Sequence, residues 1–137
     1  LDDLALAEQD LRTILEKEPD NARALNALGY TLADRTDRLE EALALIEKAY
    51  KLAPDEPAIV DSLGWVHYRL GHLDEAEKWL RKAWEMARDP EIGAHLGEVL
   101  WVQGRKDEAR AVWKETEARQ ADNRVLRATL QRFLKQE

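Results

Sequence analysis

The three histidines are the residues best suited to metal binding or acid–base chemistry in this chain of 137 residues. His67 falls on the apolar side of an expected helix, His72 lies in a turn, and His95 flanks another helix. A metal site needs ligands at spacings that bring them to one point, and these positions share no such spacing. Ser62 precedes His67 on the same helix, but the two point in different directions and cannot pair as nucleophile and base. We expect core or solvent roles for all three histidines.

Acidic pairs are the other groups that could carry chemistry. Glu40-Glu41 and Asp74-Glu75 each stand at the expected start of a helix, where carboxylates interact favourably with the helix dipole. The sequence has no Gly-rich phosphate loop and no paired-carboxylate motif elsewhere. It therefore predicts a protein that is not an enzyme, with no catalytic residue, no metal and no cofactor.

Composition narrows the class of protein further. Charged residues make up 36% and hydrophobic residues 45% of the chain, which predicts a soluble, globular, helix-rich domain. The net charge of -7 argues against a nucleic-acid partner. The absence of cysteine excludes disulfides and leaves cytosol and periplasm equally open. The opening LDDLALAEQDL has no initiator Met and no signal sequence, and we interpret it as a cut within a longer protein.

An internal repeat organises the whole chain. The segments NALGYTLA, DSLGWVHY and AHLGEVLW align at Leu-Gly pairs whose glycines, Gly29, Gly64 and Gly97, are spaced by 35 and 33 residues. An acidic signal and an apolar helical pattern follow each pair, so the unit is a helix, a short turn and a second helix. A glycine inside a helix costs about 1 kcal/mol relative to alanine. Its recurrence predicts that two helices cross there too closely for a Cβ.

Proline and glycine mark the expected helix ends. Pro57 and Pro90 suit first turns, where the missing N–H is not needed, and Gly71 and Gly104 suit the ends of first helices. The last segment, NRVLRATLQRFLKQE, has an apolar stripe on a polar helix and is expected to cap the array.

This pattern resembles the tetratricopeptide repeat (TPR) family. The matching small and apolar positions are Leu28, Gly29, Leu32, Ala42, Ile46, Ala49 and Pro54; Leu63, Gly64, Ala76, Leu80 and Ala83; and Leu96, Gly97, Ala109 and Trp113. Residues 1–19 match only a second helix, through Ala7, Leu11, Ile14 and Pro19. The sequence departs from the family at DRTDR, where a Gly turn is usual, and at Thr116 and Ala121, where Ala and Pro are usual.

The resemblance implies an all-α fold: a right-handed TPR superhelix, or α-solenoid, of antiparallel helix pairs with about eight helices. We expect one domain over residues 1–137. It comprises the second helix of a truncated repeat at 1–19, repeats at 22–54, 57–88 and 90–119, and a capping helix at 123–136.

The first helix of each TPR pair lines the concave surface, so the resemblance points to a partner-binding groove. At about 100° per residue, Trp65 points away from the packed side of its helix, which carries Val60, Leu63, Val66, His67 and Leu70. The candidate partner-binding residues on this concave face are Tyr30, Asp61, Trp65, Tyr68, Arg69, Glu98 and Trp101. Aromatic residues beside arginine are common interface anchors. The alternative is that some of these rings pack against the next repeat.

Two other groups have a structural explanation. Trp79, Trp84 and Trp113 lie on second helices and are expected to fill the core between helices. The capping helix carries the bases Arg124, Arg127, Arg132 and Lys135 and no acid. These bases form either a solvated helix face or a basic lip that attracts an acidic segment or C-terminal carboxylate of a partner.

The expected function is non-catalytic protein binding. The run LNALGYTLADRTDRLEEALALIEKAYKLAPDEPAIVDSLGWVHYRLG is similar to bacterial outer-membrane TPR lipoproteins of the LbcA type, which are adaptors of carboxyl-terminal processing proteases. That similarity implies a periplasmic protein, anchored through a region outside this segment, with a processing protease or its substrates as partner and no membrane contact of its own. The alternatives are a cytoplasmic TPR co-factor and self-association, with Leu4, Leu11 and Leu15 of residues 1–17 seeking a neighbour.

Overall fold

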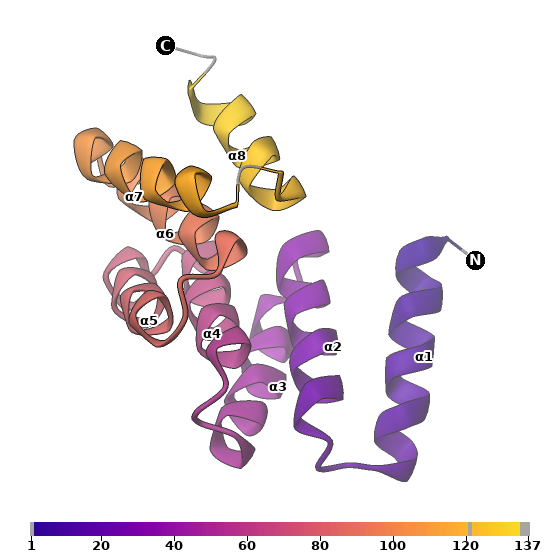
Figure 1. The fold of residues 1–137 in the computed structure, drawn as a ribbon. Coiled ribbons are helices and arrows are strands. Elements are labelled where there is room, and N and C mark those ends of the chain that lie inside the picture. The colour runs from indigo at the N-terminus through magenta and orange to yellow at the C-terminus, as the bar shows by residue number, and fades with distance from the viewer. Residues whose placement is uncertain (1, 121, 135–137) are drawn as a thin grey trace.

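A computed structural model describes residues 2–120 and 122–134 of the chain, and all regular structure within them is helical (Figure 1). The helices are α1 (Asp3–Lys17), α2 (Ala22–Arg35), α3 (Leu39–Leu52), α4 (Pro57–Arg69), α5 (Leu73–Met86), α6 (Pro90–Val102), α7 (Lys106–Arg119) and α8 (Arg124–Leu134). This confirms the predicted all-α solenoid of about eight helices. The predicted division into repeats remains a prediction, and Leu1, Ala121 and Lys135 lie outside the described residues.

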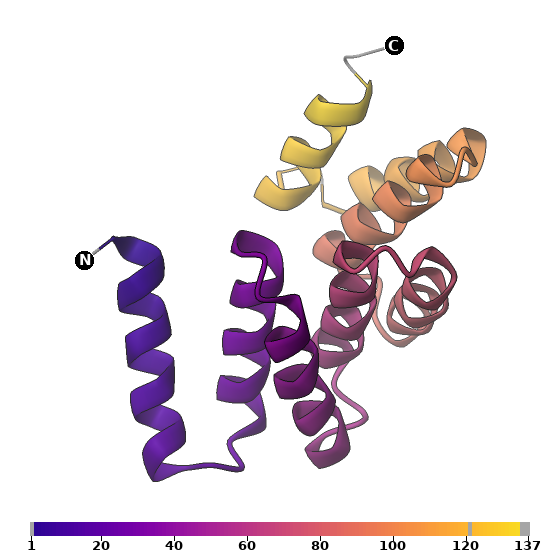
Figure 2. The same cartoon turned by 180° about the vertical axis from the view of Figure 1, so that it is seen from behind.

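The helices stack as successive antiparallel pairs. The closest partners are α2 with α3, α4 with α5, and α6 with α7, and the first helices α2, α4 and α6 also contact one another in sequence. At the ends, α1 packs on α2, and α8 packs mainly on α6, in the position of a further first helix (Figures 1 and 2). Because the first helices share one side of the stack, their free faces together form its concave surface.

Helix ends follow the signals in the sequence. Pro57 and Pro90 occupy the first turns of α4 and α6. Gly71 and Gly104 follow α4 and α6 with φ of 87° and 86°, a left-handed conformation that favours glycine. After α2, where a Gly turn is missing, the Thr36 hydroxyl donates to the Leu32 carbonyl and accepts from the Arg38 N–H. A side chain thus stabilises the turn in place of a left-handed glycine.

The repeat glycines lie at helix crossings, as predicted. A Cβ on Gly29 would stand 2.5 Å from Ile46 Cγ1, and a Cβ on Gly64 would stand 2.5 Å from Leu80 Cγ. Gly97 opposes the Trp113 indole in the same way. The third repeat adds Gly93, which makes room for Thr116, so the departure from alanine at that position is matched by a glycine across the crossing.

Buried side chains form two clusters along the stack. One centres on Leu28, Leu32 and Ile46, and the other contains Leu80 and Leu96. As predicted, Trp84 and Trp113 are buried on second helices, and Trp79 is partly buried between the two clusters. On the predicted packed side of α4, His67 and Leu70 are only partly buried. His67 Nδ1 lies 3.1 Å from Nδ1 of His72 in the following turn.

Ion-pair networks join second helices at two places. Between α1 and α3, Arg12 pairs with Glu8 and Glu41, and Arg38 pairs with the same two acids. The two arginines lower the pKa of Glu8 to about 2, mainly through hydrogen bonds from Arg38 and then Arg12. The network therefore ties α1 to the next second helix in the array.

The same four-residue network recurs between α5 and α7, where Arg81 and Arg105 each pair with Glu77 and Glu108. The intervening joint, between α3 and α5, is aromatic instead. There Tyr50 meets Trp79 edge-on with ring centroids 5.2 Å apart, and Lys82 Nζ donates to the Tyr50 hydroxyl. Successive joints on this side of the stack therefore differ in chemistry.

The terminal helix α1 has no fully buried side chain. Leu11 and Leu15 are partly buried against the cluster of α2, and Leu4 is also partly buried, whereas Leu6 and Ile14 are 44% and 38% exposed. The predicted unpartnered face is therefore carried by Leu6 and Ile14 rather than by the three leucines.

Candidate protein-binding groove

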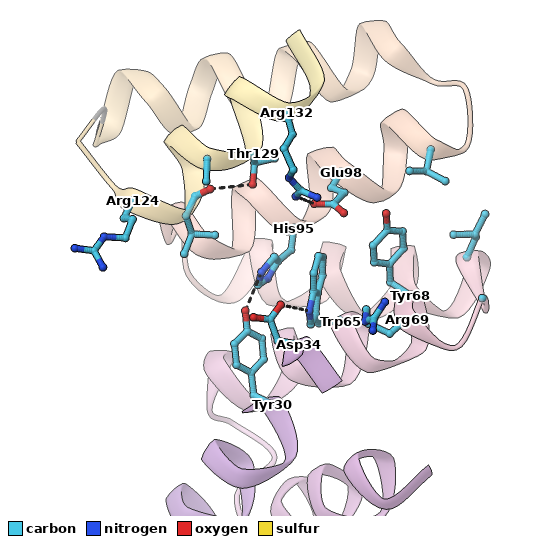
Figure 3. A pocket seen from close by; sticks show the side chains of 15 residues that line it. Tyr30, Asp34, Trp65, Tyr68, Arg69, His95, Glu98, Arg124, Thr129 and Arg132 are labelled. Carbon is cyan, nitrogen blue, oxygen red and sulfur yellow. Dashed lines mark hydrogen bonds and ion pairs between the residues drawn. The ribbon is translucent and has the colours of Figure 1, made fainter. Parts of the chain in front are cut away.

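An open groove of about 930 Å³ runs along the concave surface (Figure 3). Side chains of α2, α4 and α6 line one side, and α8 lines the other with Arg124, Val125, Ala128, Thr129 and Arg132. Because α8 takes the place of a fourth first helix, the groove lies between the last helix and the stacked first helices.

A buried hydrogen-bonded chain centred on His95 joins three first helices beneath the groove. His95 Nδ1 lies 2.9 Å from Asp61 Oδ1, and His95 Nε2 lies 3.2 Å from the Tyr30 hydroxyl. His95 and Asp61 are 2% and 6% exposed. The sequence predicted a flanking position for His95, and that prediction was wrong, because α6 turns this side chain into the interface with α4 and α2.

The charges on His95 and its hydrogen-bonded partners follow from their surroundings. Burial opposes protonation of His95, but the Asp61 carboxylate, helped by Glu98 and Glu91, outweighs it and raises the pKa of His95. The imidazolium can donate from Nδ1 to Asp61 and from Nε2 to the hydroxyl of Tyr30. Burial and the nearby carboxylates raise the pKa of that hydroxyl, so Tyr30 stays neutral.

Trp65 belongs to the floor of the groove and is not an exposed anchor. Its ring stacks on His95 at a centroid distance of 4.1 Å and an interplanar angle of 26°, and Tyr68 lies 5.0 Å away on α4. Its Nε1 donates to Asp34 Oδ1 at 3.2 Å. Figure 3 shows the rings of His95, Trp65 and Tyr68 in a row. Since Trp65 is only 6% exposed, the expectation that it points away from the core was wrong.

Glu98 is likewise occupied within the chain. It is 4% exposed, and Arg132 of α8 donates to its Oε1 at 2.6 Å. Burial and the Glu98 carboxylate raise the pKa of Tyr68, whose hydroxyl points toward Glu98 in Figure 3. This ion pair fastens α8 to α6 across the groove.

Arg69 lies in the groove but also supports α2. Its Nε donates to the Ala33 carbonyl at 2.8 Å, and its Nη2 donates to the Thr36 carbonyl at 3.3 Å. A cation at the C-terminus of a helix complements both the free carbonyls and the dipole. The side chain remains exposed, so part of the guanidinium is open to solvent.

Trp101 lies outside the groove, contrary to its predicted place on the concave strip. It stacks on Trp113 with centroids 5.6 Å apart and contacts Phe133 of α8. Lys106 and Arg110 lie over its ring. Its surroundings are those of a half-buried ring that seals the junction of α6, α7 and α8.

The structure thus divides the seven candidates into four groups. Tyr30, Tyr68 and Arg69 line the groove and remain partly accessible, and Trp65 and Glu98 form its floor. Asp61 lies beneath the floor, and Trp101 lies elsewhere. Groove residues outside the seven candidates include Asp34 and Val102, which lie on the same faces of α2 and α6 as Tyr30 and Glu98. Partners one repeat apart were the available signal, since Asp61 pairs with His95 and Glu98 with Arg132, each 34 positions along the chain.

Two features are absent from the described part of the chain. The described part of the chain contains no cluster of three or more His, Cys, Asp or Glu side chains that could hold a metal ion. None of its helices combines the length and apolar character needed to cross a membrane.

Comparison with known proteins places the repeat pattern in a family. Three models described as tetratricopeptide repeat match residues 1–57, 35–94 and 90–115. The chain is 62% identical over 96 residues to TPR repeat-containing protein PA4667 of Pseudomonas aeruginosa, covering 70% of this chain and 16% of that protein. It is 37% identical over 75 residues to bacteriophage adsorption protein A of Escherichia coli, covering 55% of this chain and 8% of that protein.

A solved structure agrees with the fold. TTC0263, a TPR protein of Thermus thermophilus, superposes with a TM-score of 0.77 at 25% identity over 91% of this chain and 71% of that one. The chain spans less than a fifth of the two curated relatives named above. TPR arrays generally mediate protein–protein interaction. With matching models along residues 1–115 and a superhelical relative of known structure, the chain belongs to the tetratricopeptide repeat family.

Proposed function

We propose that this chain is a non-catalytic binding module that holds an extended segment of a partner protein in the concave groove. The observation that carries this proposal is that the deep side chains of the groove are paired within the chain, whereas the shallow ones remain accessible. The deep polar groups, Asp61, His95 and Glu98, are paired within the chain. Tyr30 and Tyr68 are partly accessible, and Val102 is 47% exposed in the groove. A preformed floor with accessible aromatic and apolar surface suits a partner side chain.

The proposal extends to the role of the longer protein. It is a periplasmic adaptor, anchored in the outer membrane by a region outside this chain, which delivers substrates to a carboxyl-terminal processing protease. Support comes from the similarity of residues 25–71 to adaptors of this type and from the 62% identity to a bacterial TPR protein. The alternative is a cytoplasmic TPR co-factor.

Site-specific photo-crosslinking tests the groove. A photoreactive amino acid at Val102, in cells that express the longer protein, should crosslink a partner. Ala128→Trp fills the groove from α8 without removing a contact, and it should abolish that crosslink. Ala111→Trp, at an exposed position of α7 outside the groove, is the matched control and should leave it intact. A crosslink that survives in folded Ala128→Trp protein would show that the segment binds elsewhere.

A reconstituted cleavage assay tests the adaptor role separately. With the longer protein and the processing protease, Ala128→Trp should slow substrate cleavage and Ala111→Trp should not. Equal cleavage by both variants would exclude a contribution of this groove to substrate delivery. The crosslinking result would then still report on partner binding itself.

Self-association through α1 is a second candidate function, favoured by the exposed Leu6 and Ile14. Sedimentation velocity over a concentration series should then show a dimer that Ile14→Asp weakens and Ala128→Trp leaves unchanged. A monomer at all concentrations would eliminate this candidate.

A further inference from the structure

The charges left unpaired in the groove are unevenly distributed between its two sides. Within α8 every charged side chain is an arginine, although the whole chain has a net charge of -7. Of the α8 arginines that line the groove, Arg132 is neutralised by Glu98, whereas Arg124 has no partner among the described residues. The α8 side therefore presents an uncompensated positive charge at Arg124.

The opposite side carries the remaining acid. Asp34 of α2 accepts from the Trp65 indole and forms no ion pair within the described residues. Arg69 lies beside it but donates to backbone carbonyls at the end of α2. Free positive charge therefore lies on α8 at Arg124, whereas the opposite side carries one acid, Asp34, and one base, Arg69.

Apolar surface also lines the groove. It is provided by Val102 of α6, Val125 and Ala128 of α8, and the ring of Tyr68. In an extended segment, successive side chains point to opposite sides, so acidic and apolar residues in alternation present one chemistry to each side. Such a segment can face α8 with its acids and lay its apolar residues on Val102 and Tyr68.

We propose that the segment bound in this groove is an extended, acidic and apolar one, whose side-chain carboxylates face α8 and pair with Arg124. This inference rests on the proposed function and adds the chemistry and orientation of the partner. Arginine recognises carboxylates through paired N–H donors, and complementary charge sets specificity among partners. Charge, rather than area, then decides which segments the groove accepts.

Fluorescence anisotropy with synthetic peptides tests the proposal. The probe is a fluorescein-labelled 12-residue peptide of alternating Glu and Leu with an amidated C-terminus, compared with the same peptide carrying Lys in place of Glu. We expect the Glu peptide to bind at least tenfold more tightly. Arg124→Glu should reverse that order, whereas Arg127→Glu should preserve it. Arg127 lies on the same helix but outside the groove. Because Arg127→Glu changes the net charge of the chain by the same amount as Arg124→Glu, it controls for long-range electrostatics.

Each other outcome would overturn the proposal. The Lys peptide could bind as tightly as the Glu peptide, or Arg124→Glu and Arg127→Glu could behave alike. Binding only by a Glu peptide with a free C-terminal carboxylate would assign recognition to the terminus instead. If no peptide binds but Val102 crosslinks a partner that Ala128→Trp excludes, this inference fails while the proposed function stands. If Val102 also crosslinks no partner, or if Ala128→Trp leaves the crosslink intact, the proposed function fails as well.

Discussion

Replacing Asp61 with asparagine should reverse the pH dependence that His95 gives to the stability of the chain. In the wild type the Asp61 carboxylate overcomes the effect of burial, and the pKa of His95 lies above its ordinary value of 6.5. The folded state then binds the proton more tightly than the unfolded state. The stability from this pair is therefore complete below pH 6.5 and is lost as pH rises through the folded pKa. Without the carboxylate, burial lowers the pKa of His95, and stability rises with pH.

The size of the effect follows from the two contributions that Asp61 makes. At pH 5.5 the variant must deprotonate His95 about one unit below its unfolded pKa, which costs about 1.4 kcal/mol. Exchanging a charge-assisted hydrogen bond for a neutral one removes roughly 1.5 kcal/mol more. The expected loss in the free energy of unfolding is thus about 3 kcal/mol at pH 5.5, and it becomes smaller at pH 8, where the first contribution vanishes.

Urea denaturation followed by circular dichroism at the two pH values measures this difference. Glu91→Gln, one helical turn from His95, is the matched control, because it removes an exposed carboxylate and keeps the buried pair. The chain has two further histidines, so the difference between the wild type and His95→Gln isolates the contribution of His95. If Asp61→Asn lost the same free energy at both pH values, the assignment of a buried ion pair would be refuted.

Three further results are expected. Gly64→Ala places a Cβ 2.5 Å from Leu80 Cγ, and overpacking of about 1–3 kcal/mol should outweigh the gain in helix propensity and lower the urea midpoint; a higher midpoint would contradict the crossing. Arg105→Gln removes a hydrogen bond that helps to keep the pKa of Glu77 below its ordinary value, against the effect of burial. The melting temperature of the variant should therefore be lower than that of the wild type at pH 7 and equal to it near pH 3. A lower melting temperature that persisted near pH 3 would argue against the network. Trp101→Ala should lower stability by about 2–3 kcal/mol without changing the groove crosslink, and loss of the crosslink in folded protein would return Trp101 to the site.

The fold could be predicted because its determinants recur at fixed spacing. Gly29, Gly64 and Gly97 repeat at a position where only a missing Cβ allows the crossing, and the local signals at Gly71 and Gly104 act within one turn. Each of these effects involves a single helix pair. A sequence of three such pairs therefore specifies its helices and their order before any tertiary structure is known.

The candidate groove was less predictable because its side chains make their main contacts with residues of neighbouring repeats. A helical wheel for α4 gives Trp65 a direction relative to α5, but α6 covers that direction with His95. The same reasoning applies to Glu98, which Arg132 of α8 neutralises. Contacts between consecutive first helices depend on the rotation from one repeat to the next, and no local pattern encodes that rotation. Pairs of complementary residues spaced one repeat apart are the sequence signal from which such contacts can be predicted.

The alternation of joints along the second helices has a consequence for how the array responds to its medium. Dissolved salt weakens exposed ion pairs and slightly strengthens the burial of aromatic surface. The joints closed by Arg12 and Arg105 should therefore slacken as ionic strength rises, while the joint of Tyr50 with Trp79 holds. The stiffness of this solenoid should therefore vary along its length. The two outer contacts between second helices should loosen as salt concentration rises, and the central aromatic contact should not.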